Sequence, residues 1–136
     1  MTPQRPNHYA GDVHWIDHSL HSGPNSQKTF KYPHFAVILT SNNLLSRANY
    51  PFVAYVPMTS YKPEKHGVFN NGYGRYPQDV LLKTTQYSAL DKDTIIDCGQ
   101  VYTCDYECFN QFRFRLNPSD LKEVRKRLSV VLGYGL

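Results

Sequence analysis

FAVIL, at residues 35–39, and FVAYVPM, at residues 52–58, are the two apolar runs that decide the fold. Each has the length of a strand rather than of a helix, and each is rich in the β-branched and aromatic residues that suit a sheet. We therefore expect two central strands here. Pro57 should mark an edge or a bulge near the end of the second, because proline donates no hydrogen bond to a neighbouring strand.

Shorter segments of similar character predict further strands on either side of this pair. They are residues 12–16 (DVHWI), 79–83 (DVLLK), 94–97 (TIID), 100–104 (QVYTC) and the alternating stretch around 112–115 (FRFR). The fourth should continue the third beyond a bulge at Gly99. In the last, Arg113 and Arg115 share one face, which is either an RNA-facing ridge or an ordinary wet face.

The 136 residues fit one domain, residues 1–136, with a polar arm over residues 1–10. A long loop follows the first strand up to about residue 33. A second loop, over residues 61–77, contains Asn71-Gly72 as a turn former and should be a mobile surface segment. The fold class expected is mainly β, and only the end of the chain differs.

A C-terminal helix is predicted over residues 118–133, because helix-start residues precede apolar positions at helical spacing. Its four cationic side chains should lie mostly away from the apolar stripe, on a solvated face. These are Lys122, Arg125, Lys126 and Arg127.

Charge and composition favour an anionic partner. The formal net charge is +4, and eleven tyrosines supply flat surfaces on which bases can stack, although sheet packing would use them equally well. No apolar stretch is long enough for a membrane helix, and the N-terminus lacks the apolar core of a signal peptide, so we expect a cytoplasmic protein without membrane contact.

The cysteines Cys98, Cys104 and Cys108 are odd in number and lack CxxC spacing. This pattern fits reduced thiols better than a disulfide framework. A zinc site formed by Cys104, Cys108 and a distant histidine is the alternative.

Five short pieces, in order, resemble the MazF/PemK toxins of type II toxin-antitoxin systems. They are GDVHWID at 11–17, AVILT at 36–40, VPMTS at 56–60, Gln100-Val101 with Thr103, and the ending from Pro118 through Gly133. The resemblance covers nearly the whole chain. It implies an SH3-like antiparallel β-barrel with a terminal helix, a homodimer, and a cognate acidic antitoxin as partner.

The resemblance also implies cleavage of single-stranded RNA without a metal ion or other cofactor. The substrate's own 2′-hydroxyl attacks, leaving a 2′,3′-cyclic phosphate and a 5′-hydroxyl. This chemistry needs a base, an acid and donors that stabilise the charged phosphorane. The family uses an Arg-Pro pair at the head of one strand and a Thr or Ser at the end of the next.

Thr59 matches the hydroxyl position, and its neighbour Ser60 offers a second donor. The arginine is absent: a gapless alignment places His34 there, whereas pairing the prolines places Tyr32 there with Lys31 beside it. An imidazole transfers protons near neutral pH, so His34 is a candidate acid or base. Lys31 is a candidate clamp on phosphate.

Contacts to RNA are expected just beyond these residues. Tyr61 offers a stacking surface, Lys62 and Lys65 offer charge for phosphates, and Gln100 matches a family position near the floor of the site. The missing arginine favours a second function from a different class. This is a noncatalytic module that binds RNA, or blocks a protein such as gyrase as one relative of the fold does.

Overall fold

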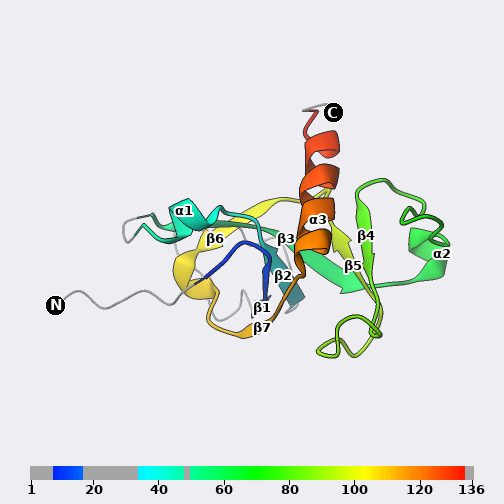
Figure 1. Ribbon diagram of the computed structural model, residues 1–136, viewed down its shortest axis with the longest axis horizontal. Helices are drawn as coiled ribbons and strands as arrows, with labels where there is room; N and C mark the ends of the chain where they lie inside the picture. Colours follow the sequence, from blue (N-terminus) through cyan, green and yellow to red (C-terminus); the bar gives the residue numbers. More distant parts are fainter. Residues whose placement is uncertain (1–7, 17–33, 48–49, 134–136) are drawn as a thin grey trace.

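The computed structural model describes residues 8–16, 34–47 and 50–133. Seven strands in these residues form one antiparallel sheet, in the order β4-β5-β3-β2-β1-β7, with β6 pairing beside β3. The sheet curls into a half-barrel and the C-terminal helix α3 lies against it (Figure 1). The elements are β1 (Asp12–Ile16), β2 (His34–Ile38), α1 (Asn42–Leu45), β3 (Phe52–Ser60), α2 (Pro63–His66), β4 (Asp79–Leu82), β5 (Thr94–Asp97), β6 (Tyr102–Asp105), the 3-10 helix η1 (Tyr106–Cys108), β7 (Phe112–Arg115) and α3 (Pro118–Val131).

The predicted fold class is confirmed, since the two apolar runs form β2 and β3 at the centre of the sheet. Pro57 does not lie on an edge strand, because it is buried and pairs with Ala36 of β2. On its other side, β3 pairs with β6 over residues 52–55 and with β5 over residues 58–60. Pro57 thus falls where β3 changes partner, and its missing N–H interrupts neither ladder.

β5 and β6 follow one another along this same side of β3, but a turn at Cys98 and Gly99 separates them and β6 begins only at Tyr102, so the expected continuation of one strand beyond a bulge at Gly99 was wrong. The curled sheet has a core on each side. One is covered by α3 and contains Val37, Val56 and Val124. The other is closed by η1 and contains Tyr55 and Phe109.

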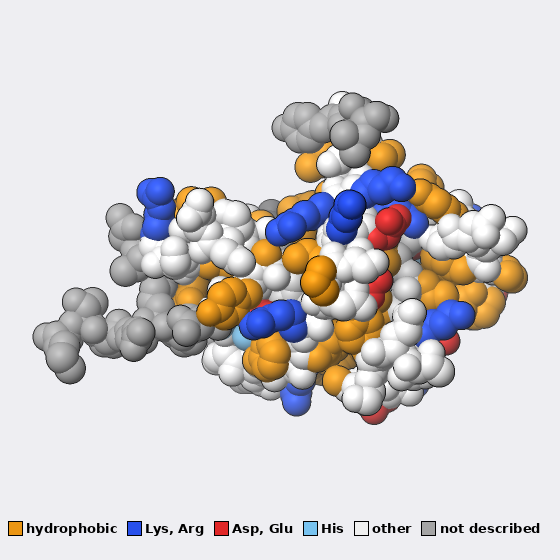
Figure 2. Space-filling model, in the orientation of Figure 1, with side chains coloured by type: hydrophobic (Ala, Val, Ile, Leu, Met, Phe, Trp, Pro, Cys, Tyr) orange, Lys and Arg blue, Asp and Glu red, His pale blue; other side chains and the backbone are white. Residues whose placement is uncertain are grey.

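Helix α3 ends at Val131, two residues before the predicted end. Asn117 caps its N-terminus by accepting a hydrogen bond from the Asp120 N–H at 2.7 Å. Lys and Arg side chains gather on the exposed side of the helix (Figure 2). The prediction of a solvated face was wrong for one of the four cations, because Arg127 is buried.

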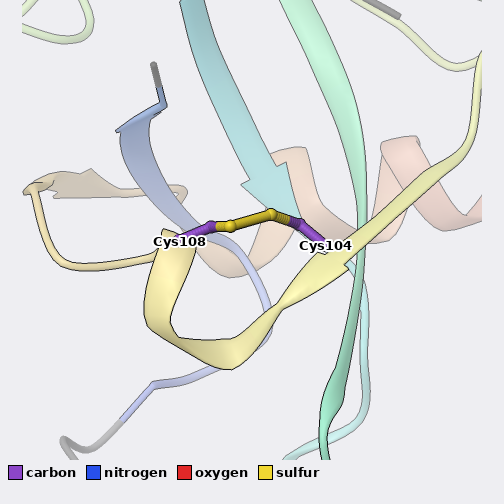
Figure 3. Close-up of a disulfide and its surroundings, with 2 residues drawn as sticks. All are labelled: Cys104 and Cys108. Atoms are coloured by element: carbon purple, nitrogen blue, oxygen red, sulfur yellow. A yellow bond between two sulfur atoms is a disulfide. The ribbon is translucent and has the colours of Figure 1, made fainter. Parts of the chain in front are cut away.

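Cys104 and Cys108 form a disulfide (Figure 3). The prediction of reduced thiols was therefore wrong for these two residues, and their sulfurs are not available to the zinc site considered above. The η1 turn folds the chain back after β6 and brings the two Cα atoms to 6.4 Å, within the range a disulfide spans. Cys98 is a free thiol, and burial raises its pKa to about 12, so it is protonated and unreactive.

Two further sequence expectations concern the polar N-terminal arm and contact with a membrane. Of the polar arm, residues 1–7 lie outside the described residues, and His8 and Ala10 are buried. Within the part of the chain that the structure describes, no helix is long and apolar enough to cross a membrane.

Candidate functional site

Two predicted site residues come together at one end of the β2–β3 pair. The pairing of the two strands ends at Ala36 and Pro57, and His34 and Thr59 lie two residues beyond that pair on their strands, where both line one cavity. Residues 25 positions apart in sequence are thus neighbours at the open end of the β2–β3 pair.

A cavity of about 370 Å³ lies at this end of the sheet. Its floor is apolar, since Met58 and Leu90 are buried, and its exposed wall carries hydroxyl groups at Thr59 and Ser60. Three of the predicted site residues therefore lie on one cavity. The lining consists of Trp15, His34, Phe35, Met58, Thr59, Ser60, Leu90, Asp91, Lys92 and Thr94.

Asp91 and Lys92 were missed by the sequence analysis. They belong to the turn before β5, which is held by hydrogen bonds from the Thr94 hydroxyl to the Lys92 carbonyl at 2.8 Å and from the Thr84 N–H to the Asp93 carboxylate at 2.9 Å. The pairing of Ser60 with Thr94 places this turn beside the end of β3. Only that long-range pairing identifies Lys92 as the cation of the cavity wall.

His34 is half-buried, and its ring lies 6.3 Å from the ring of Tyr55. Burial raises the pKa of Tyr55 well above its usual range, so this neighbour is an uncharged phenol. Thr59 and Ser60 are both exposed at the end of β3. The cavity thus holds an imidazole, a carboxylate, an ammonium group and two hydroxyls within one opening.

Four other predicted RNA contacts do not line this cavity. The Tyr61 hydroxyl donates to the Gly67 carbonyl at 2.7 Å, and its ring packs on Phe69, so Tyr61 holds the following loop together. Lys62 and Lys65 are exposed at α2. Gln100 is exposed, and its side-chain amide donates a hydrogen bond to the Asp97 carboxylate and accepts one from the Tyr102 hydroxyl.

Lys31 lies outside the described residues, as does the long loop predicted after the first strand. The segment 61–77 is described, and it contains structure that the sequence analysis missed. His66 is buried and accepts a hydrogen bond from the Lys62 N–H at 2.9 Å, which closes the α2 turn. Gly67 has φ +82° and a Cβ there would meet the Arg75 nitrogen at 2.8 Å, so this position requires glycine. The turn predicted at Asn71-Gly72 is confirmed by the bridge between Asn70 and Tyr73.

The chain matches a protein-family model over most of its length. The model of the family described as "PemK-like, MazF-like toxin of type II toxin-antitoxin system" matches residues 9–132. No curated protein sequence matches the chain.

Solved structures show the same fold at low sequence identity. An endoribonuclease from a mycobacterial species is 12% identical with a TM-score of 0.66, covering 96% of each chain. A mycobacterial endoribonuclease in complex with its cognate antitoxin is 13% identical with a TM-score of 0.65, covering 99% of each chain. MazF from Deinococcus radiodurans is 19% identical with a TM-score of 0.60, covering 94% of this chain and 98% of that one. At these identities the likeness establishes the fold.

Proposed function

Because the chain belongs to the PemK-like, MazF-like toxin family of type II toxin-antitoxin systems, we propose that it cleaves single-stranded RNA, with the His34–Thr59 cavity as its active site. The observation that supports this most is the meeting of His34, Thr59 and Lys92 on one cavity, contributed by three separate segments. The reaction needs no metal ion, because the substrate supplies its own nucleophile.

In this reaction the 2′-oxygen of a ribose attacks the adjacent phosphorus, and the bond between phosphorus and the 5′-oxygen breaks. A base takes the proton of the 2′-hydroxyl and an acid gives a proton to the departing 5′-oxygen. The products are a 2′,3′-cyclic phosphate and a 5′-hydroxyl. Two groups on the cavity wall transfer protons readily, the imidazole of His34 and the carboxylate of Asp91.

The remaining polar groups stabilise the phosphorane. The hydroxyls of Thr59 and Ser60 donate to its nonbridging oxygens, and the ammonium of Lys92 supplies the positive charge that the family takes from arginine. Lys31, three residues before His34 in the sequence, adds a second charge. Lys62 and Lys65 bind phosphates of the same strand outside the cavity.

We also propose the assembly expected of the family, a homodimer that is inhibited by an acidic segment of a cognate antitoxin. The solved structures of similar fold include a complex of an endoribonuclease with its antitoxin. A basic chain with a net charge of +4 is the electrostatic complement of such a segment. Light scattering of the purified chain should give twice the mass of one copy, and a monomer at micromolar concentration would contradict the dimer.

Paired variants test the active site. Thr59→Ala should slow cleavage by roughly 100-fold or more, the usual effect of removing one transition-state donor. Thr85→Ala removes an exposed threonine that does not line the cavity and should cleave at the wild-type rate. His34→Ala should lose roughly 100- to 10,000-fold, as expected for a proton-transfer group.

Lys92→Gln tests the replacement of the family arginine. It should lower the cleavage rate, whereas Lys83→Gln, an equal change of charge at an exposed lysine outside the cavity, should not. If these variants bind and cleave RNA like the wild type, the active site is elsewhere. If the wild type binds RNA but generates no new ends, the chain is a noncatalytic binding module.

A further inference from the structure

A second cavity, of about 340 Å³, lies between β1 and β7 and shares no lining residue with the first. Its walls come from the two paired strands, from His8 ahead of β1 and from the segment between η1 and β7. Its lining combines polar and aromatic side chains. The lining consists of His8, Asp12, His14, Phe109, Asn110, Phe112 and Arg115.

His14 is the most unusual side chain of this cavity. Its relative exposure is only 2%, yet both ring nitrogens are buried without a hydrogen-bond partner in the part of the chain that the structure describes. Burial, with a smaller effect of His8, lowers its pKa to about 4 against the opposing effect of Asp12. At neutral pH the ring is therefore uncharged, with one N–H donor and one acceptor nitrogen unused. Buried polar groups are normally paired, so these two nitrogens are unused hydrogen-bonding positions for a polar ligand.

Aromatic rings surround this polar group. The Phe109 and Phe112 rings lie 5.6 Å and 5.7 Å from the His14 ring, centroid to centroid, and both meet it edge to face. Phe112 is 54% exposed, which is unusual for a phenylalanine, and it lines the cavity. A flat ligand entering beside Phe112 would cover this ring and lie next to the side chain of His14.

The charge of the cavity lies at its rim. Arg115 donates from Nε to the buried Asp12 carboxylate at 2.5 Å, and 52% of the Arg115 side chain is exposed. Its position is fixed further because the guanidinium lies over the Tyr9 ring at 4.6 Å. This ion pair neutralises the Asp12 carboxylate inside the cavity, while half of the Arg115 side chain remains exposed to an approaching anion. An uncharged aromatic interior with a cation at the rim matches a base attached to a phosphate.

We propose that this second cavity binds a nucleobase of a single-stranded RNA. The base stacks on Phe112 and exchanges hydrogen bonds with His14, and its phosphate contacts Arg115. This rests on the proposed function, because the RNA is the strand cut at the first cavity. His14 is two residues from Ile16, about 7 Å along β1, and Ile16 pairs with His34. One RNA strand can therefore reach both cavities, and the second cavity selects the base near the cleaved bond.

Nuclear magnetic resonance titration tests this assignment without relying on cleavage. Full-length protein labelled with nitrogen-15 is titrated with the four nucleoside 5′-monophosphates, the matching nucleosides and inorganic phosphate. At least one nucleotide should shift the His14 ring nitrogens and the Phe112 amide at millimolar concentration, and its nucleoside should give the same shifts with weaker affinity. Shifts produced equally by inorganic phosphate, or no shift with any nucleotide, would overturn the proposal.

Variants locate the binding. His14→Phe keeps the ring but removes both nitrogens, and Phe112→Ala removes an exposed stacking surface whose loss should not affect folding. Each should weaken nucleotide binding about five-fold or more, the lower limit for losing one stacked base. Arg115→Gln should weaken binding of the nucleotide but not of the nucleoside, whereas Arg113→Gln, the same change at an exposed neighbour outside the cavity, should change neither. Unchanged affinity in Phe112→Ala would contradict the assignment.

The two proposals fail separately. If the wild type does not cleave RNA but still binds a nucleotide at His14, only the proposed nuclease activity is refuted. If RNA is cleaved and no nucleotide shifts the His14 ring, only the base-binding site is refuted.

Discussion

Replacing Arg127 with methionine should destabilise the protein more than any other single change of a charged residue in α3. The guanidinium of this buried residue connects α3 to β4 and to the loop before it. Its contacts are Glu123 through Nε at 2.7 Å, the carbonyls of Pro77, Asp79 and Gly72 at 2.8, 3.0 and 2.8 Å, and the ring of Tyr73 at 3.9 Å.

The magnitude follows from these contacts. A hydrogen bond to a charged group contributes roughly 1.5–3 kcal/mol, and the carbonyl of Asp79 would remain buried without its donor. Gly72 is exposed, so water replaces part of what its carbonyl loses. We therefore expect a loss of about 3–4 kcal/mol in the free energy of unfolding, a large part of the roughly 5–15 kcal/mol of a typical domain.

Urea denaturation followed by tryptophan fluorescence measures this loss, since the chain has a single tryptophan. Arg125→Met, at an exposed position two residues earlier in the same helix, is the matched control and should change stability by less than about 0.5 kcal/mol. Arg127→Lys should fall between the two, because an ammonium cannot reach the three carbonyls at once. An Arg127→Met protein within about 1 kcal/mol of the wild type would refute this reasoning.

Three further predictions concern stability. Asn117→Ala removes the side-chain cap of α3 and should cost about 1 kcal/mol in urea denaturation, while Ser119→Ala, an exposed position of the first turn, should cost less. Burial and the hydrogen bond to Asp120 raise the pKa of Tyr87 to about 12, so the folded state favours the neutral phenol. This contribution to the free energy of unfolding should be fully present below pH 10 and should be lost as the pH rises towards 12. Tyr87→Phe should lack this alkaline loss, and an unchanged profile would contradict the assignment. The pKa of His14 is lowered from 6.5 to about 4, so the folded state favours the neutral imidazole. The corresponding stability is present above about pH 6.5 and is lost as the pH falls towards 4. In an acid titration, His14→Phe should therefore lose less unfolding free energy than the wild type.

The elements that could be predicted from the sequence are those whose pattern is local. The apolar runs of β2 and β3 and the helical spacing of α3 each report burial over one continuous segment. β3 ends at Ser60, two residues beyond the predicted strand, so Thr59 lies in its last two residues. His34 and Thr59 could be proposed together from the sequence, but only the folded structure shows that they line one cavity.

What could not be predicted depends on long-range placement. Lys92 reads as an ordinary turn lysine until β5 pairs with the end of β3. Arg127 reads as part of a solvated helical face until its guanidinium meets the carbonyls of a distant loop. The disulfide of Cys104 and Cys108 depends on the η1 turn, which the spacing of the cysteines does not indicate. His14 likewise looks like any residue of an alternating strand, and its unpaired nitrogens become apparent only when Phe109 and Phe112 surround it.

The chemistry of the RNA ends is the measurement that tests the central claim most directly. The wild-type protein is incubated in EDTA with a long single-stranded RNA, and with the same RNA carrying a 2′-deoxy sugar at each mapped cleavage position. The account predicts fragments ending in 2′,3′-cyclic phosphate and beginning with 5′-hydroxyl, and no cleavage at the deoxy positions. Cleavage that stops in EDTA, persists at a deoxy sugar or leaves 5′-phosphates would contradict it.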